Sequence, residues 1–219
     1  KTDEVQMAVA YISYGNQTAY TFTSLEEAIE VAKDGETIRL IRDVVLSKIL
    51  TINKSITLDG NGYKLTSTAD RAINVDLNGK VTIKNLVIES GKGCQRAINI
   101  IEKPAEVTIE NVKANGNFIY AVHVATSAGS AKATINNCEL TGLNVVNVAG
   151  EGSQVTVTNT KLTCNDQNTK ESYAALAICN EAKNATITAN NITFEINGDS
   201  VKASAGAEYS TITIDGKTD

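Results

Sequence analysis

Proline, tryptophan and histidine are scarce in this chain, and neither sign of charge dominates. Its 219 residues include one Pro, no Trp and one His, and 20 Lys and Arg against 25 Asp and Glu leave a net charge of -5. Because nucleic-acid binding needs a concentrated basic surface, this balance argues against a nucleic-acid partner. No apolar run approaches the roughly 20 residues of a membrane-spanning helix, so we predict no membrane span.

The four cysteines lack the close paired spacing of a zinc site, so we predict no metal site and no cofactor. They are Cys94, Cys138, Cys164 and Cys179. Four thiols allow three disulfide pairings, and the sequence does not choose between them. Small buried Cys is common in folded chains, so packed free thiols are the preferred interpretation.

Thr, Val, Ile and Asn are in excess, and this mixture is typical of strands joined by polar turns. A first series of strand-like segments places a threonine between apolar residues at intervals of 22 to 30 residues: Thr57, Thr82, Thr108, Thr134, Thr156, Thr186 and Thr213. A second series recurs at 24 to 30 residues: Ala72–Val75, Ala97–Ile100, Ala121–Val124, Val145–Val148 and Ala175–Ile178. Two series that share one period indicate a solenoid. Because apolar and polar residues alternate, we expect Ile, Val and Leu to face inward and Thr, Asn and Lys to face solvent.

An asparagine directly follows the first segment in five repeats. These residues are Asn85, Asn111, Asn137, Asn159 and Asn191. Asn tolerates the left-handed backbone of a sharp corner, and stacked Asn side chains can hydrogen-bond to one another, so we predict a structural asparagine ladder. A short strand such as Leu86–Ile88 follows each corner, then a variable loop, then the second series. The prediction is about seven coils of ~25 residues, each with three short strands.

This order of strand, one-residue Asn corner, strand, variable loop and strand resembles the right-handed parallel β-helix of the pectin-lyase-like superfamily over residues 37–219. The resemblance implies an all-β chain folded as a single-stranded right-handed parallel β-helix, similar to bacterial cell-surface β-helix proteins. An antiparallel sandwich of short strands is the alternative, but it would not need this repeated register. The resemblance also implies an extracellular or cell-surface location, as does a first residue, Lys1, that is not an initiator Met.

Residues 1–36 precede the repeats and are predicted to cover the N-terminal end of the core, which a solenoid must protect. Ser24 and Glu27 form a capping box, and the apolar stripe behind them predicts an amphipathic capping helix over residues 24–33. The alternating segment from Val5 to Tyr14 is predicted to be an edge strand. No comparable C-terminal cap is recognisable in the sequence.

The second series provides the candidate binding site, because enzymes of the resembled superfamily work on the outer face of the sheet that follows the variable loop. The residues predicted to point outward there, together with those at the adjacent loop ends, are Arg71, Asn74, Arg96, Asn99, Tyr120, His123, Asn144, Asn147 and Tyr173. Amides, guanidinium groups and phenols match sugar hydroxyls and carboxylates, so polysaccharide is the candidate ligand. A surface protein is the alternative partner, and the oligomeric state is left open. The structural alternative is that stacked Asn side chains satisfy one another on a solvated sheet.

These residues do not support catalysis, and we predict no catalytic residue. A glycosidase needs two carboxylates about 5 to 9.5 Å apart, and the predicted outward positions contain none. His123 could act as a general base beside Tyr120 or Arg96, but the equivalent position is Asn in three other repeats. We therefore predict a non-catalytic extracellular or cell-surface module that acts as a rigid scaffold or adhesin. The alternative is a polysaccharide lyase or glycoside hydrolase of the same superfamily with an atypical site.

Overall fold

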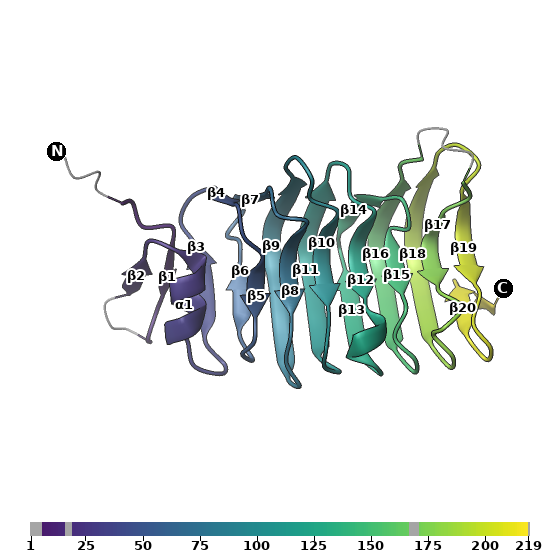
Figure 1. Cartoon of the computed structure of the whole chain (residues 1–219), viewed down its shortest axis with the longest axis horizontal. Coiled ribbons are helices and arrows are strands. Elements are labelled where there is room, and N and C mark those ends of the chain that lie inside the picture. The colour runs from purple at the N-terminus through teal and green to yellow at the C-terminus, as the bar shows by residue number, and fades with distance from the viewer. Residues whose placement is uncertain (1–5, 16–18, 167–170, 219) are drawn as a thin grey trace.

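A computed structural model describes residues 6–15, 19–166 and 171–218 of the chain, and its fold is all-β. The chain winds into a right-handed parallel β-solenoid of about seven turns, which confirms the predicted fold class (Figure 1). Successive turns follow one another along the long axis, so the two ends of the chain lie at opposite ends of a rod. Among the described residues, no helix is both long and apolar enough to cross a membrane.

Two sheets form the wall of the solenoid. The large sheet contains β1 (Ala10–Ile12), β2 (Tyr20–Phe22), β3 (Thr37–Leu40), β4 (Val44–Leu46), β6 (Thr57–Asp59), β7 (Lys64–Ser67), β9 (Lys80–Ser90), β11 (Glu106–Asn115), β13 (Lys132–Asn136), β14 (Glu139–Gly142), β16 (Gln154–Cys164), β18 (Thr186–Ile196), β20 (Thr211–Ile214) and β21 (Lys217–Thr218). The small sheet contains β5 (Leu50–Ile52), β8 (Arg71–Val75), β10 (Arg96–Ile100), β12 (Tyr120–Val124), β15 (Val146–Val148), β17 (Ala174–Ile178) and β19 (Val201–Ala205). A 3-10 turn spans Thr126–Ala128. In the described chain, antiparallel pairing is confined to the two ends of the large sheet.

Strand pairing follows the period read from the sequence, with one exception. Thr82 pairs with Thr108 in the next turn, as predicted. In β18, however, Thr156 pairs with Thr188 and not with the predicted Thr186. A shift of two residues keeps every side chain on its own face of the sheet, so the alternation pattern does not distinguish these two registers.

The asparagine corners bend the strands but do not end most of them. Four strands run through their corners and are 10 or 11 residues long in total: β9, β11, β16 and β18. In contrast, β13 and β14 are separate strands. The prediction of three separate short strands per coil is therefore wrong for four of these turns. One left-handed residue changes the chain direction while the residues on both sides stay paired to neighbouring turns.

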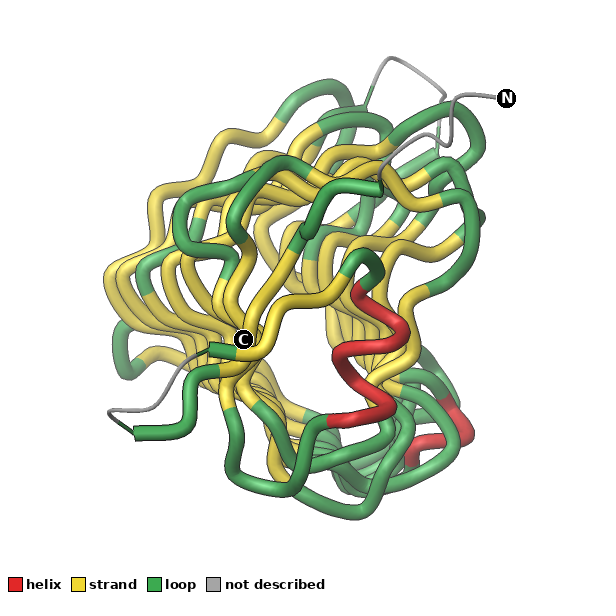
Figure 2. Tube along the Cα trace, turned by 90° about the vertical axis from the view of Figure 1, so that its left-hand side faces the viewer, coloured by secondary structure: helices red, strands yellow, loops and turns green. Residues whose placement is uncertain are grey.

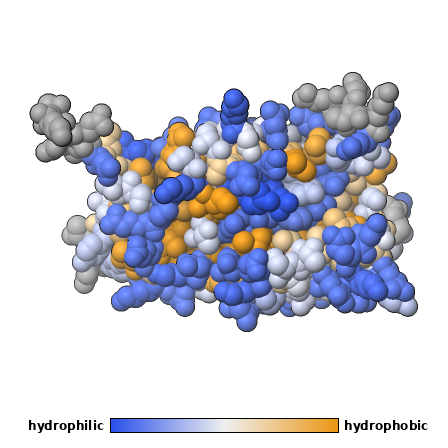
Figure 3. All heavy atoms as spheres, viewed as in Figure 1, coloured by the Kyte–Doolittle hydropathy of each residue, from blue (hydrophilic) through white to orange (hydrophobic). Residues whose placement is uncertain are grey.

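Aliphatic side chains stack in register inside the solenoid and form its core. Ile83, Ile109, Ile135 and Val157 are consecutive members of one fully buried stack. Burial of these side chains and their close packing make the rod stiff. From outside, hydrophobic residues gather mainly to the left of the centre of the face in Figure 3, whereas hydrophilic residues lie just right of the centre and along the lower margin.

The N-terminal segment places a helix at the first turn of the solenoid. The helix α1 (Leu25–Val31) lies at this end of the two sheets (Figure 2). Ser24 Oγ accepts a hydrogen bond from the Glu27 backbone N–H at 3.1 Å, and Leu25 and Ile29 are buried. The helix is shorter than the predicted 24–33, because Ser24 and Ala32 are its cap residues and have non-helical backbone. That this helix protects the core stays a prediction.

The predicted edge strand is much shorter than its sequence pattern indicated. Among its described residues only Ala10–Ile12 forms a strand. This strand pairs antiparallel with both β2 and β3, so the prediction of an edge strand is wrong, and β2 lies at the edge of the sheet. The start of the predicted segment, Val5, lies outside the described residues.

Candidate functional site

Five side chains on the outer face of the small sheet form a row that is buried. Asn74, Asn99, His123, Asn147 and Ala177 occupy equivalent positions on β8, β10, β12, β15 and β17. We call them the covered row, because each is at most 9% exposed. Strand alternation points them away from the core side chains next to them. The prediction that this row faces solvent is therefore wrong.

Side chains from the starts of the same strands cover part of this row. Tyr120 lies against His123 with ring centroids 4.5 Å apart and ring planes at 14°. The Arg96 guanidinium carbon lies 5.1 Å from the Tyr120 ring centroid, and Arg96 Nη1 donates a hydrogen bond to Asn99 Oδ1 at 3.2 Å. Each covering residue lies three positions before the row residue that it contacts. The side chains therefore fold back over their own strands, which alternation alone does not reveal.

Hydrogen bonds within the covered row satisfy its buried polar groups. Asn99 Nδ2 donates to Asn74 Oδ1 at 2.9 Å, and Asn147 Nδ2 lies 3.0 Å from His123 Nδ1. Cys179 Sγ donates to Asn147 Oδ1 at 3.5 Å. Since Asn147 Oδ1 is the acceptor there, Asn147 Nδ2 donates to His123 Nδ1, and the imidazole proton lies on Nε2. Asn74 and Asn99 therefore satisfy one another, and Asn147 is satisfied by His123 and Cys179, on a covered sheet and not on a solvated one.

His123 is held in its neutral form. Burial, with the charge of Arg96 as the next cause, lowers the pKa of His123 to about 3. Such a weak base holds almost no proton near neutral pH, and its Nδ1 is already bonded to Asn147. Burial also raises the pKa of Tyr120, which keeps the phenol neutral. Both shifts disfavour proton transfer by these residues.

Two arginines lie side by side at the starts of β8 and β10. Arg71 and Arg96 pair in register, and together with Tyr120 they form a surface that we call the arginine ledge. Arg71 Nη1 contacts Asp70 Oδ2 at 2.7 Å. Burial, followed by the positive charge of Arg71, lowers the pKa of Arg96. All three ledge residues are half-buried, so their outer edges remain accessible to a ligand.

The carboxylates that bracket β8 both have cationic partners. Asp70 is paired with Arg71, and Asp76 Oδ1 lies 3.5 Å from Lys103 Nζ. Asp76 Oδ1 is buried and accepts no hydrogen bond from the described residues, so the ion pair with Lys103 is the polar contact that it makes. The described residues also contain no group of three His, Cys, Asp or Glu side chains placed to hold a metal ion. All four cysteines are free thiols.

The last two predicted site residues lie on the turns that follow Tyr120, just before β15 and β17. Asn144 Oδ1 accepts a hydrogen bond from the Ala174 backbone N–H at 2.9 Å, and Tyr173 Oη donates to Glu171 Oε2 at 2.6 Å. Asn144 and Tyr173 line a small pocket of about 170 Å³ with Asn147. The nine predicted residues therefore do not form one continuous open groove. They divide into the ledge, the covered row and this pocket.

The five corner asparagines share a left-handed backbone, with φ between 49° and 54°. Asn111 Nδ2 donates to Asn85 Oδ1 at 2.9 Å, and Asn191 Nδ2 donates to Asn159 Oδ1 at 2.8 Å. The predicted ladder is interrupted between these pairs. None of the side-chain hydrogen bonds among the described residues involves the amide of Asn137.

Asp59 ends the ladder on its N-terminal side. Its Oδ1 accepts hydrogen bonds from Asn85 Nδ2 at 3.2 Å and from the Asn61 backbone N–H at 2.9 Å, and its Oδ2 lies 3.3 Å from Arg39 Nε. Burial raises the pKa of Asp59, but these hydrogen bonds outweigh burial and hold the pKa below its ordinary value. Each bonded amide of the ladder donates to the turn on its N-terminal side, so the first member of the ladder needs only to accept. A carboxylate such as that of Asp59 only accepts hydrogen bonds and therefore suits this position.

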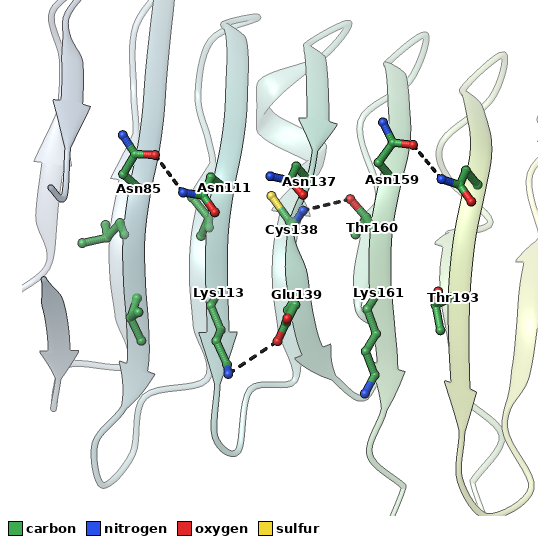
Figure 4. A pocket seen from close by; sticks show the side chains of 14 residues that line it. Asn85, Asn111, Lys113, Asn137, Cys138, Glu139, Asn159, Thr160, Lys161 and Thr193 are labelled. Carbon is green, nitrogen blue, oxygen red and sulfur yellow. Dashed lines mark hydrogen bonds and ion pairs between the residues drawn. The ribbon is translucent and has the colours of Figure 1, made fainter. Parts of the chain in front are cut away.

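The corners also line a groove that the sequence analysis missed (Figure 4). This corner groove has a volume of about 490 Å³. Its second side is a row in register two positions after each corner: Val87, Lys113, Glu139, Lys161 and Thr193. The sequence did contain a signal for this groove, because Lys113, Glu139 and Lys161 each lie two residues after a corner asparagine.

Comparison with protein-family models, with curated proteins and with solved structures found no match. Function is therefore inferred from the geometry of the chain itself.

Proposed function

We propose that this chain is a non-catalytic extracellular or cell-surface module of the pectin-lyase-like superfamily, a rigid scaffold or adhesin that binds acidic carbohydrate. The observation that carries the proposal is the arginine ledge. There, two adjacent guanidinium groups and a tyrosine lie over a buried, hydrogen-bonded row. The ledge takes the place of the predicted exposed Asn face as the surface that contacts the ligand.

The chemistry of the ledge favours a ligand with repeated carboxylates. A guanidinium group has five N–H donors and binds a carboxylate through two parallel hydrogen bonds. Arg71 therefore keeps donors for a ligand beyond the Nη1 that contacts Asp70, and it lies one turn, about 4.8 Å along the solenoid, from Arg96. Arg96 is already oriented by Asn99 and Tyr120, so little side-chain freedom remains to be lost on binding. A polymer of acidic sugars offers carboxylates in a row, together with hydroxyls for the phenol.

The same geometry supports binding over catalysis. With a pKa of about 3 and its Nδ1 bonded to Asn147, His123 is unsuited to act as a general base near neutral pH. Asp70 and Asp76, the carboxylates that bracket β8, are each ion-paired. A stiff solenoid with a preformed polar ledge fits a protein that holds a polysaccharide and leaves it intact.

The proposal is tested by binding purified chain to polygalacturonate and alginate, with neutral polysaccharides as comparison and chain cleavage assayed in parallel. Arg71→Gln and Arg96→Gln should each weaken binding to the acidic polymers roughly tenfold, as expected for a lost charge-assisted contact. Binding should also weaken with added salt, because the ledge is partly exposed. Lys80→Gln is the matched control, since it removes one positive charge from the exposed large sheet.

Three results would count against the proposal. Equal affinities for the two arginine variants and Lys80→Gln would remove the ledge as the binding site. Cleavage of any polymer by the wild-type chain would favour the lyase or hydrolase alternative. Failure to bind every polymer would leave a structural stalk or a protein-binding adhesin as the better account.

A further inference from the structure

The corner groove is a second polar surface that shares no residue with the arginine ledge. It crosses consecutive turns of the large sheet, from β9 to β18. The corner asparagines lie on one side of it, and the row that contains Lys113, Glu139 and Lys161 lies on the other (Figure 4). Neighbouring turns are about 4.8 Å apart, so the asparagine side of the groove offers one amide per turn along the solenoid.

Asn137, near the middle of the groove, has a side-chain amide with free hydrogen-bonding capacity. The neighbouring residue, Asn136, replaces it in the ladder, because Asn136 Oδ1 accepts from Asn159 Nδ2 at 3.3 Å and from Thr158 Oγ1 at 3.0 Å. In Figure 4, dashed lines join Asn85 to Asn111 and lead from Asn159, but none reaches Asn137. Its NH₂ and carbonyl groups can therefore both bond to a ligand.

The charged side chains on the opposite side of the groove are ion-paired, one of the two lysines with Glu195, which lies outside the groove. Lys113 Nζ lies 3.4 Å from Glu139 Oε2, and Lys161 Nζ lies 2.9 Å from Glu195 Oε2. An anionic polymer would have to displace a glutamate to reach either lysine. A ligand that is itself uncharged would leave both pairs intact.

The backbone beneath the groove cannot pair with an added peptide strand. The strands here are interior members of the large sheet, and Val112 and its neighbours are hydrogen-bonded to turns on both sides. Strand addition needs an open sheet edge, which this groove lacks. Its accessible hydrogen-bonding groups are side-chain amides, a threonine hydroxyl and paired charges, and these suit hydroxyl-rich ligands.

We propose that the corner groove binds a neutral linear polysaccharide that lies along the solenoid axis, with sugar hydroxyls hydrogen-bonded to the Asn137 amide. An amide donates and accepts as a sugar hydroxyl does, so the two groups can satisfy one another. The turns repeat every ~4.8 Å, so a linear chain that lies along the solenoid axis crosses one turn after another and passes Asn137.

The test uses hexasaccharides of β-1,4-linked glucose and β-1,4-linked mannose as neutral probes, with hexagalacturonate as the acidic counterpart. Nuclear magnetic resonance of ¹⁵N-labelled wild-type chain should show a saturable shift of the Asn137 side-chain amide signal with at least one neutral probe. Titration calorimetry should give the same dissociation constant. That affinity should be nearly independent of salt, because no net charge is recognised.

The informative variant is Asn137→Gly, because φ is 54° at this position and glycine adopts this conformation without strain. It should weaken binding of the neutral hexasaccharide roughly fivefold, as expected for one hydrogen-bonding amide. Asn184→Gly is the matched control, since Asn184 also has a left-handed backbone, with φ of 60°, but does not line the groove. Its affinity should equal that of the wild type.

Failure of this inference can be separated from failure of the acidic-carbohydrate proposal. If neither neutral probe shifts the Asn137 signal, or if Asn137→Gly and Asn184→Gly bind equally well, the corner groove is not the site. Arg71→Gln should leave neutral-probe binding unchanged. If Arg71→Gln weakens the neutral probe as much as Asn137→Gly does, the ligand lies on the ledge and the inference is overturned.

Discussion

Acidification should destabilise the fold through its single histidine. The pKa of His123 is about 3 in the folded chain and 6.5 for an unperturbed imidazole, so the folded state binds fewer protons than the unfolded state between these values. Stability therefore decreases as the pH falls below about 6.5, and the loss continues down to about pH 3. The physical cause is burial beneath Tyr120 next to the positive charge of Arg96.

The size of the effect follows from the two pKa values. Near pH 7.5 the imidazole is neutral in both states and contributes almost nothing to the pH dependence. At pH 5 most of the unfolded chains carry a protonated His123 while the folded chains do not, which corresponds to about 2 kcal/mol of lost stability. Few carboxylates titrate above pH 5, so this window isolates the histidine.

Urea denaturation at intervals between pH 7.5 and 5 measures this loss directly. The matched variant is His123→Asn, because Asn occupies the equivalent position in β8, β10 and β15 and does not titrate. The variant should lose about 2 kcal/mol less than the wild type over this range, whatever its stability at pH 7.5. Parallel pH dependences for the two proteins would refute the claim that His123 is buried and neutral.

Four further predictions concern stability and are measured by urea denaturation. Asp59→Asn should destabilise the chain at pH 7 and flatten its acid limb, since the lowered pKa of Asp59 gives stability that is lost as pH falls through the folded value; an unchanged acid limb would contradict this. Asn111→Ala should cost about 1 kcal/mol more than Asn111→Gly because φ is 50° there, and equal losses would argue against a strained corner. Ser24→Ala should remove the helix cap and about 1 kcal/mol, whereas no change would show that α1 contributes little. Phe118→Ala should cost about 3 to 5 kcal/mol, because the ring is 2% exposed, and a loss below 1 kcal/mol would contradict its burial.

The fold was predictable because the information for it is distributed over the whole chain. Each turn repeats the same alternation and the same corner, so several independent segments indicate one period. Ambiguity arose where local patterns allow two answers. Thr186 and Thr188 lie on the same face of β18, and only pairing with Thr156 shows which of them is in register.

The candidate site was less predictable because it depends on how side chains fold over one another. Alternation correctly separates His123 from the core side chains beside it, but it cannot show that Tyr120 lies on top. The interruption of the asparagine ladder was unpredictable for the same reason, because it also depends on contacts between side chains. Asn136 and Asn137 are adjacent and identical, and the fold alone determines that the Asn136 side chain bonds to the next turn while the Asn137 side chain does not.

The covered row and the arginine ledge are best understood as one unit. Buried amides are costly unless each has a partner, and in this row the partners lie one turn away, at Asn74 for Asn99 and at Asn147 for His123. A shift in register would leave these groups unsatisfied, so the row favours the observed stacking of turns. Because Arg96 is bonded to the same row, its guanidinium group has a fixed position. A ligand would then meet a surface whose geometry is set by the solenoid before binding begins.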